Sequence, residues 1–183
     1  MKYLIASDLH GSAEYVKKLM DAWEREDAFA MLLLGDILYH GPRNALPRDY
    51  DTMKCVEMLN SRFSRIVCVR GNCDAEVDQM VLEFNLQHDC LDYYADGRRL
   101  FLTHGHLYNP IEPPAGLYPG DVMLSGHTHV PACFQSPEGV WFMNPGSVSI
   151  PKNGSPHSYM TLENDVFRWK TLEGAVYREL ALE

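Results

Sequence analysis

Three apolar runs in the first half of the chain each end abruptly in a polar cluster, and this recurrence constrains the fold more than any other feature. Residues 2–7 run into D-L-H-G, residues 30–34 into G-D, and residues 64–69 into R-G-N-C-D. Short apolar runs bounded by turn residues are typical of buried strands. The sequence therefore predicts three buried strands whose ends carry polar side chains.

Amphipathic segments lie between these runs. Residues 12–26, with Ser12 as the capping residue, and residues near 51–60 carry apolar side chains at helical spacing. Alternation of strands and helices favours a parallel sheet. Ligands bind to open α/β sheets beyond the carboxyl ends of the strands, so we expect the polar clusters to meet at one edge.

Strands also dominate the second half of the predicted fold. Residues 98–103 and 122–125 form apolar runs before H-G-H and G-H-T-H. Four later segments alternate apolar and polar residues between turn signals, which is typical of antiparallel strands: residues 140–143, 158–162, 166–171 and 176–182. A chain of 183 residues is long enough for one good core. We expect a single α/β domain over residues 1–183, with two facing sheets and the helices outside.

The net charge and the cysteine content limit the possible binding partners and the cellular location of the chain. The formal net charge of -9 argues against tight, sequence-independent nucleic-acid binding, which needs clustered Lys and Arg. The five cysteines include no C-x-x-C pair and follow no secretory segment, which predicts a reducing, cytoplasmic location. No apolar run approaches the ~20 residues that cross a bilayer. A small phosphorylated substrate fits these limits, and a homo-oligomer is left open.

Seven side chains with metal-binding chemistry follow the predicted strand ends. They are Asp8, His10, Asp36, Asn72, His104, His127 and His129. Asp8 and His10, like His127 and His129, are two residues apart, so each pair points to one side if its segment is extended. We therefore expect each pair to reach a shared metal ion.

The motifs D-L-H, G-D, G-N-C-D, H-G-H and G-H-T-H occur in an order that resembles the calcineurin-like metallophosphoesterases. The resemblance covers roughly the first three quarters of the chain. The short length, the H-G-H and the segment N-P-G-S at residues 144–147 are most similar to the small bacterial and archaeal phosphodiesterases of that superfamily. This resemblance implies a four-layer α/β/β/α sandwich of two facing mixed β-sheets with helices outside.

The resemblance also implies a ligand set for two divalent metal ions. Asp8, His10 and His129 would hold one ion, Asn72, His104 and His127 the other, and Asp36 would bridge them. Carboxylate, amide and imidazole donors suit manganese, zinc, iron, cobalt or nickel, and the resemblance favours manganese. Four positive charges against two carboxylates would lower the pKa of a water that bridges the ions. We expect a hydrolase, a metal-dependent phosphodiesterase in which this water attacks a small phosphate diester.

The chain departs from the superfamily at Cys73, where most members have a histidine thought to protonate the leaving group. A thiol is a weak hydrogen-bond donor, so we expect slow turnover or a preference for good leaving groups. Asp74 is predicted to orient a metal ligand or the leaving-group side. His106 is predicted to be a donor behind the ligands or an alternative acid. Cys73, Asp74 and His106 are thus the candidate catalytic residues.

Plainer explanations exist for single motifs. A lone Asp-x-His at a strand end is more often a cap or a turn, but five such motifs in order favour a site. Arg43 and Arg48 could meet a substrate phosphate, or they could be ordinary loop residues. Alternative functions are a phosphomonoesterase or protein phosphatase of the same fold and a non-catalytic scaffold. A nuclease is a weaker option because of the acidic charge balance.

Overall fold

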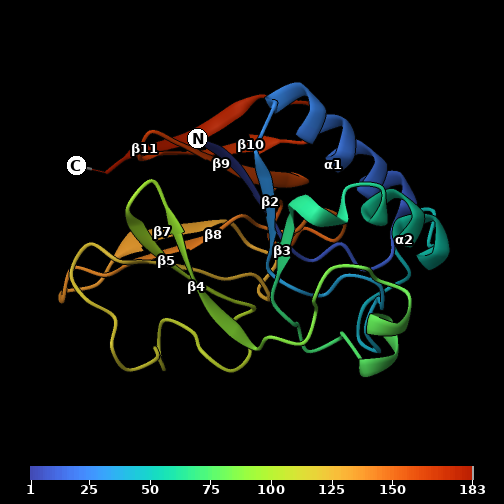
Figure 1. Cartoon of the computed structure of the whole chain (residues 1–183), viewed down its shortest axis with the longest axis horizontal. Helices are drawn as coiled ribbons and strands as arrows, with labels where there is room; N and C mark the ends of the chain where they lie inside the picture. The colour runs from blue at the N-terminus through green and yellow to red at the C-terminus, as the bar shows by residue number, and fades with distance from the viewer. Residues whose placement is uncertain (183) are drawn as a thin grey trace.

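Two mixed β-sheets face each other in the computed structural model, which describes residues 1–182 (Figure 1). The first sheet has the strand order β11-β10-β9-β1-β2-β3. Its strands are β1 (Lys2–Ala6), β2 (Ala30–Leu33), β3 (Ile66–Cys68), β9 (Ser158–Glu163), β10 (Val166–Thr171) and β11 (Val176–Ala181). Strands β1, β2 and β3 run parallel, as the strand–helix alternation predicts, and β9 to β11 pair antiparallel.

The second sheet has the strand order β4-β5-β6-β8-β7. Its strands are β4 (Cys90–Ala95), β5 (Arg98–Thr103), β6 (Val122–Leu124), β7 (Ala132–Gln135) and β8 (Trp141–Asn144). Strands β5, β6 and β8 are parallel, and β4 and β7 form antiparallel edges. The carboxyl ends of β5 and β6 therefore lie at the same edge of this sheet.

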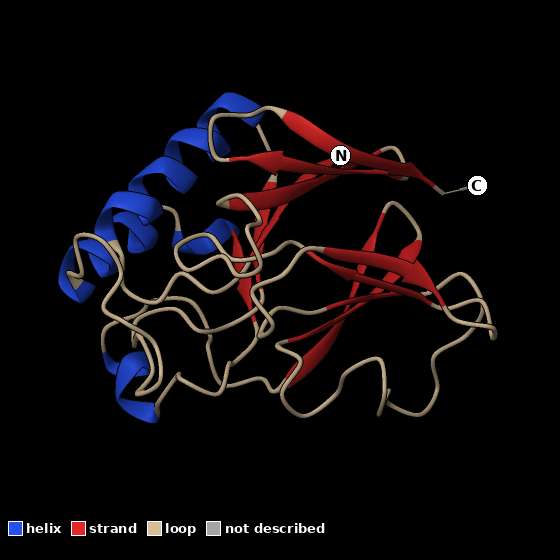
Figure 2. Ribbon diagram, turned by 180° about the vertical axis from the view of Figure 1, so that it is seen from behind, coloured by secondary structure: helices blue, strands red, loops and turns tan. Residues whose placement is uncertain are grey.

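Helices cover the outer face of the first sheet (Figure 2). These covering helices are α1 (Ala13–Glu26) and α2 (Thr52–Asn60). The 3-10 helix η1 (Phe63–Arg65) leads directly into β3, and the 3-10 helix η2 (Glu76–Met80) lies apart from this face, among the loops (Figure 1 and Figure 2). The outer face of the second sheet is covered instead by the loop of residues 104–121, whose Tyr108 and Leu117 pack against a cluster that includes Phe101 and Phe142. The expected α/β sandwich of two facing mixed sheets is confirmed, with a loop as the layer on this side.

The central strand β1 shows why both faces of the first sheet are buried. Leu4 and Ala6 pack against the helices, whereas Tyr3 and Ile5 pack into the core between the two sheets. Side chains alternate between the faces of a strand, so a strand covered on both sides is apolar throughout. Within residues 1–182, no helix is long and apolar enough to span a bilayer.

Local structure differs from the sequence-based expectations at several elements. The third strand begins at Ile66 because Phe63–Arg65 form a 3-10 turn. Ser12 occupies the N-cap position of α1, but its hydroxyl donates to the carbonyl of Arg48 instead of capping the helix. Strands β4 and β7 and helix η2 are not predicted. The first of these has a usable signal, since Asp96-Gly97, both with positive φ, form the two-residue turn between β4 and β5.

Candidate metal centre

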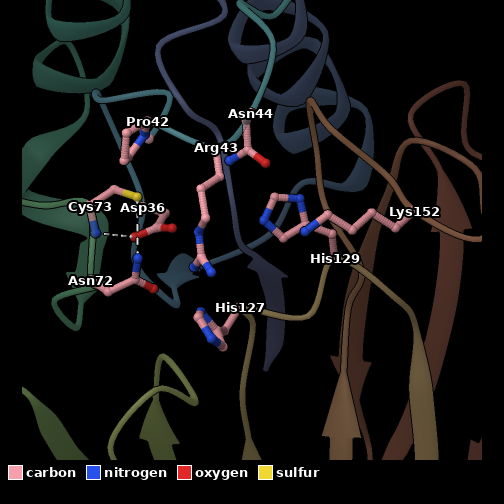
Figure 3. Close-up of a pocket in the computed structure, with 10 residues that line it drawn as sticks. Asp36, Pro42, Arg43, Asn44, Asn72, Cys73, His127, His129 and Lys152 are labelled. Carbon is pink, nitrogen blue, oxygen red and sulfur yellow. Dashed lines mark hydrogen bonds between the residues drawn. The ribbon is translucent and has the colours of Figure 1, made fainter.

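The seven predicted ligands meet where the carboxyl ends of strands from both sheets converge. Asp8 and His10 follow β1, Asp36 follows β2, and Asn72 follows β3. From the second sheet, His104 follows β5, and His127 and His129 follow β6. Asp36, Asn72, His127 and His129 line a pocket of about 370 Å³, drawn in Figure 3, whereas Asp8, His10 and His104 are fully buried.

Left-handed turns shape this site. Asp8, His10, His127 and His129 have φ of 58°, 47°, 66° and 61°, and Asp36 has φ of 57°. The expectation that the two pairs lie in extended segments is therefore wrong. Each such residue costs about 1–2 kcal/mol and persists only where its surroundings hold it. These turns direct the side chains of His127 and His129 apart, although the two residues are only two positions apart in the sequence.

One group of donor atoms consists of Asp8 Oδ1, His10 Nε2 and His129 Nε2. Asp8 Oδ1 lies 3.7 Å from His10 Nε2 and 3.3 Å from His129 Nε2, and the two ring nitrogens are 3.3 Å apart. His10 Nδ1 donates to the carbonyl of Tyr39 at 2.8 Å, and His129 Nδ1 to that of Ile150 at 2.6 Å. A carbonyl only accepts, so each neutral ring carries its proton on Nδ1 and presents a lone pair on Nε2.

A second group lies beside it and is joined to it by Asp36. His104 Nδ1 donates to the carbonyl of Leu34 at 2.7 Å, so in the neutral ring Nε2 carries the lone pair. His104 Nε2 lies 3.1 Å from Asn72 Oδ1 and 3.4 Å from Asp36 Oδ2. The same Asp36 oxygen is 3.6 Å from His10 Nε2. The ring of His127 lies on this side of the pocket, 5.1 Å from that of His104 between centroids.

These donors fit divalent cations. Asp8 Oδ1 is buried and has no hydrogen-bond partner among the described residues, which is costly for a carboxylate without a counter-charge. With both rings neutral and protonated on Nδ1, the Nε2 lone pairs of His10 and His129 face each other at 3.3 Å and would repel. Donor atoms that share an ion at ~2.1 Å lie about 3.0–3.4 Å apart, close to the separations seen here.

Two buried carboxylates, Asp8 and Asp36, stay ionised at this site. Burial acts to raise the pKa of Asp36, but the hydrogen bond and charge of His104 and the backbone N–H of Cys73 hold it well below its usual range. Burial acts to lower the pKa of His104, but Asp36 and Asp8 raise it to about 9. The carboxylates therefore stay ionised and attract positive charge at neutral pH.

Asp74 lies behind Asp36 and does not line the pocket. Its Oδ2 accepts from the backbone N–H groups of Asp36 at 2.8 Å and Gly71 at 2.7 Å, and its Oδ1 from that of Ile37 at 2.7 Å. Burial raises the pKa of Asp74 to about 6, although these N–H groups oppose the shift. One carboxylate thus holds the turn of Asp36 and the turn before Asn72 together.

Cys73 lines the pocket itself. Its backbone N–H donates to Asp36 Oδ1 at 2.8 Å, and its Sγ accepts from Asn72 Nδ2 at 3.3 Å (Figure 3). Burial and the charge of Asp36 raise the pKa of Cys73 to about 12, so the group is a thiol at neutral pH.

His106 lies beside the second donor group. Its ring is half-buried, 5.4 Å from the ring of His104 and 6.3 Å from that of His127 between centroids. Burial and the charge of His104 lower the pKa of His106. Its Nδ1 is buried without a partner among the described residues. A role for His106 in the reaction stays a prediction.

The N-P-G-S segment and Ser149 support both donor groups from behind, a role that the sequence did not assign to them. Ser147 Oγ and Ser149 Oγ both donate to the carbonyl of Asp8, at 2.9 and 3.0 Å. Asn144 Nδ2 donates to the carbonyl of Gly126 at 2.7 Å, directly before His127. The segment N-P-G-S was the available signal, because an Asn followed by Pro-Gly-Ser marks a turn rich in backbone-binding side chains.

Close approach of the backbone explains two glycines of the motifs. A Cβ added to Gly71 would collide with Asp36 Oδ1. A Cβ added to Gly126 would collide with Ser7 Oγ and lie 2.8 Å from Asp8 Oδ2. Only glycine leaves room for the carboxylates to take their positions.

Two cationic side chains reach the pocket. Arg43 extends into it from the loop after β2, and Lys152 lines it from the segment after β8 (Figure 3). The other loop arginine, Arg48, pairs instead with Glu14, its Nε lying 3.3 Å from Oε2. Of the two arginines considered from the sequence, Arg43 therefore belongs to the pocket.

The sandwich and the donor set together define the class of protein, an α/β sandwich with a candidate metal site at the strand ends. The family model of the Calcineurin-like phosphoesterase superfamily domain matches residues 1–166. The chain belongs to this family, and the resemblance inferred from its motifs is confirmed.

Individual relatives agree with this membership. The chain is 47% identical over 166 residues to the phosphodiesterase YfcE of Escherichia coli, covering 91% of this chain and 89% of the relative. The solved structure of YfcE, a phosphoesterase from E. coli, matches with a TM-score of 0.95 and 44% identity over 100% of both chains. The probable metallophosphoesterase YsnB of Bacillus subtilis is 28% identical over 90% of this chain and 86% of its own length. The expectation of a hydrolase is confirmed, and the family implies divalent metal ions.

Proposed function

We propose that the chain hydrolyses a small phosphate diester at a centre of two divalent metal ions, by attack of a water on phosphorus. Asp8, His10 and His129 would hold one ion, Asn72, His104 and His127 the other, and Asp36 both. The observation that carries the proposal is the pair of donor groups that share Asp36 Oδ2 within one pocket. Residues 1–183 would act as a single metallophosphoesterase domain.

When bound, the two cations would lower the pKa of a water between them and polarise the phosphoryl oxygens. The protein's part is to hold the donors rigidly. The Nδ1–H bonds of His10, His104 and His129 to backbone carbonyls fix both the tautomer and the ring orientation. Asp74 fixes the turn of Asp36 in the same way through backbone N–H groups. We propose manganese, because oxygen and imidazole donors suit it and no thiolate is required.

The pocket favours a small anionic substrate. Arg43 and Lys152 add positive charge at the rim, where they can neutralise and orient a phosphate. A volume of about 370 Å³ suits a small molecule, and the net charge of -9 disfavours a long polyanion. Cys73 supplies no strong acid at the pocket wall, which supports slow turnover or good leaving groups.

A non-catalytic scaffold is the alternative of a different class. The donors argue against it, because costly left-handed turns and a partnerless buried carboxylate oxygen are maintained together. A cytoplasmic location is supported by five free cysteines.

The decisive experiment combines metal analysis of the purified protein with two chromogenic substrates, bis(4-nitrophenyl) phosphate and 4-nitrophenyl phosphate. We expect two ions per chain and faster cleavage of the diester with manganese. Faster cleavage of the monoester would favour a phosphomonoesterase. One ion per chain in the active protein would contradict the binuclear centre.

A further inference from the structure

A second pocket, of about 410 Å³, lies against the metal centre and differs from it in chemistry. Its walls come from the loop after β2, the start of α2 and helix η2, and they include the side chains of Tyr39, Tyr50, Met53, Val77 and Val81. We call it the apolar pocket. The one carboxylate on its wall, that of Asp78, accepts a hydrogen bond from the backbone N–H of Ala75 at 2.8 Å.

The apolar pocket gathers large apolar side chains that are exposed to solvent. The exposed fractions are 61% for Met53, 64% for Val77, 40% for Tyr39 and 37% for Val81. Single exposed apolar residues are ordinary, but several around one hollow are typical of a ligand site. Burial of these side chains by a ligand would therefore stabilise its binding.

Two residues connect the apolar pocket to the metal centre. Cys73 lines both pockets, and Gly41 packs closely against it, since an added Cβ there would lie 3.0 Å from the Cys73 Sγ. The backbone carbonyl of Tyr39 holds the His10 ring at 2.8 Å, while the Tyr39 side chain lines the apolar pocket. A thiol is small and behaves as an apolar group, so the boundary at Cys73 suits an apolar substituent.

We propose that the apolar pocket binds one ester substituent of the substrate, and that this substituent is an aromatic or similarly flat apolar group. This inference rests on the proposed function, because the phosphate must lie at the metal centre for the substituent to reach past Cys73. Together, the two pockets then favour a substrate with one anionic end and one apolar end. Its anionic phosphate lies beside Arg43 and Lys152, and its aromatic group lies among Met53, Val77 and Tyr39.

The test compares two phosphonates that cannot be hydrolysed at the C–P bond, benzylphosphonate and methylphosphonate. Their dissociation constants are measured by calorimetry on the manganese-loaded protein. Burial of the ring predicts about tenfold tighter binding of benzylphosphonate. The double variant Met53→Gln/Val77→Thr keeps the size of both side chains but adds polarity, and it should reduce this ratio to about threefold or less.

Ile111→Thr is the matched control, because Ile111 is β-branched like Val77, is 91% exposed and lines neither pocket. It should keep the full ratio. Equal affinities in the wild type, or an unchanged ratio in the double variant, would overturn the inference. Cleavage of bis(4-nitrophenyl) phosphate is measured separately. If that activity is absent while the ratio and its loss in the double variant remain, the proposed function fails and the apolar pocket stands as a binding site.

Discussion

The two donor groups of the metal centre differ in how firmly the protein holds them. Asp8, His10 and His129 are buried, and both rings are anchored to backbone carbonyls. In the other group, His104 is equally buried and anchored, but Asn72 is exposed and His127 is half-buried at the pocket wall. We call them the buried group and the open group. The protein's own hydrogen bonds therefore fix every ring of the buried group, whereas two donors of the open group lie at the pocket wall.

Loss of the residue common to both groups should have the largest effect. Asp36→Ala is expected to lower kcat/KM for bis(4-nitrophenyl) phosphate by about a thousandfold or more, because both ions lose a donor and several kcal/mol of transition-state stabilisation. Circular dichroism should show an unchanged fold. Substantial activity in this variant would contradict the prediction that Asp36 contributes a donor to both groups.

Metal removal tests the difference between the groups directly. We expect a chelator to remove manganese in two phases, with the ion of the open group lost first because its donors reach solvent. His127→Ala should abolish the fast phase, and His129→Ala should abolish the slow one. Each substitution should lower the affinity for its ion by on the order of 100-fold. Metal content is followed by elemental analysis. A single phase, or the reverse assignment of the two variants, would contradict the comparison.

Asp74→Asn probes the support behind both groups. An amide nitrogen cannot accept from the backbone N–H groups of Asp36, Gly71 or Ile37, so at least one of them loses its partner. We expect a loss of about 1–3 kcal/mol in the free energy of unfolding. Activity should fall about 10- to 100-fold through misplacement of Asp36. Normal kcat with reduced stability would restrict Asp74 to a structural role.

Cys73→His addresses the open side of the centre and should have the smallest effect. An imidazole can donate a proton to the leaving group, so rates on diesters with poor leaving groups should rise by about tenfold, with little change for 4-nitrophenolate. Cys73→Ser is the control of similar size. Rates that are unchanged or lower across a panel of good and poor leaving groups would refute this prediction.

The sequence predicted the structure best where a short stretch of residues is enough to specify a strand. Apolar runs ending in polar clusters predict β1, β2 and β5, and Arg98–Thr103 has the expected bounds. Strand β7 was missed because half of its side chains are exposed, so no apolar run marks it. The five motifs identify the family by their order, because the end of each parallel strand places its polar side chains at the same edge of a sheet.

What this sequence determines by itself is therefore the set of donors, their order along the chain and the class of fold. The tertiary structure decides how the donors divide, because left-handed turns send His127 and His129 to different partners although they are two residues apart. It also decides that Asp74 binds three backbone N–H groups, and that apolar side chains from three elements gather beside Cys73. Such contacts join segments far apart in the chain. No local periodicity encodes them, since each depends on where the other segments lie.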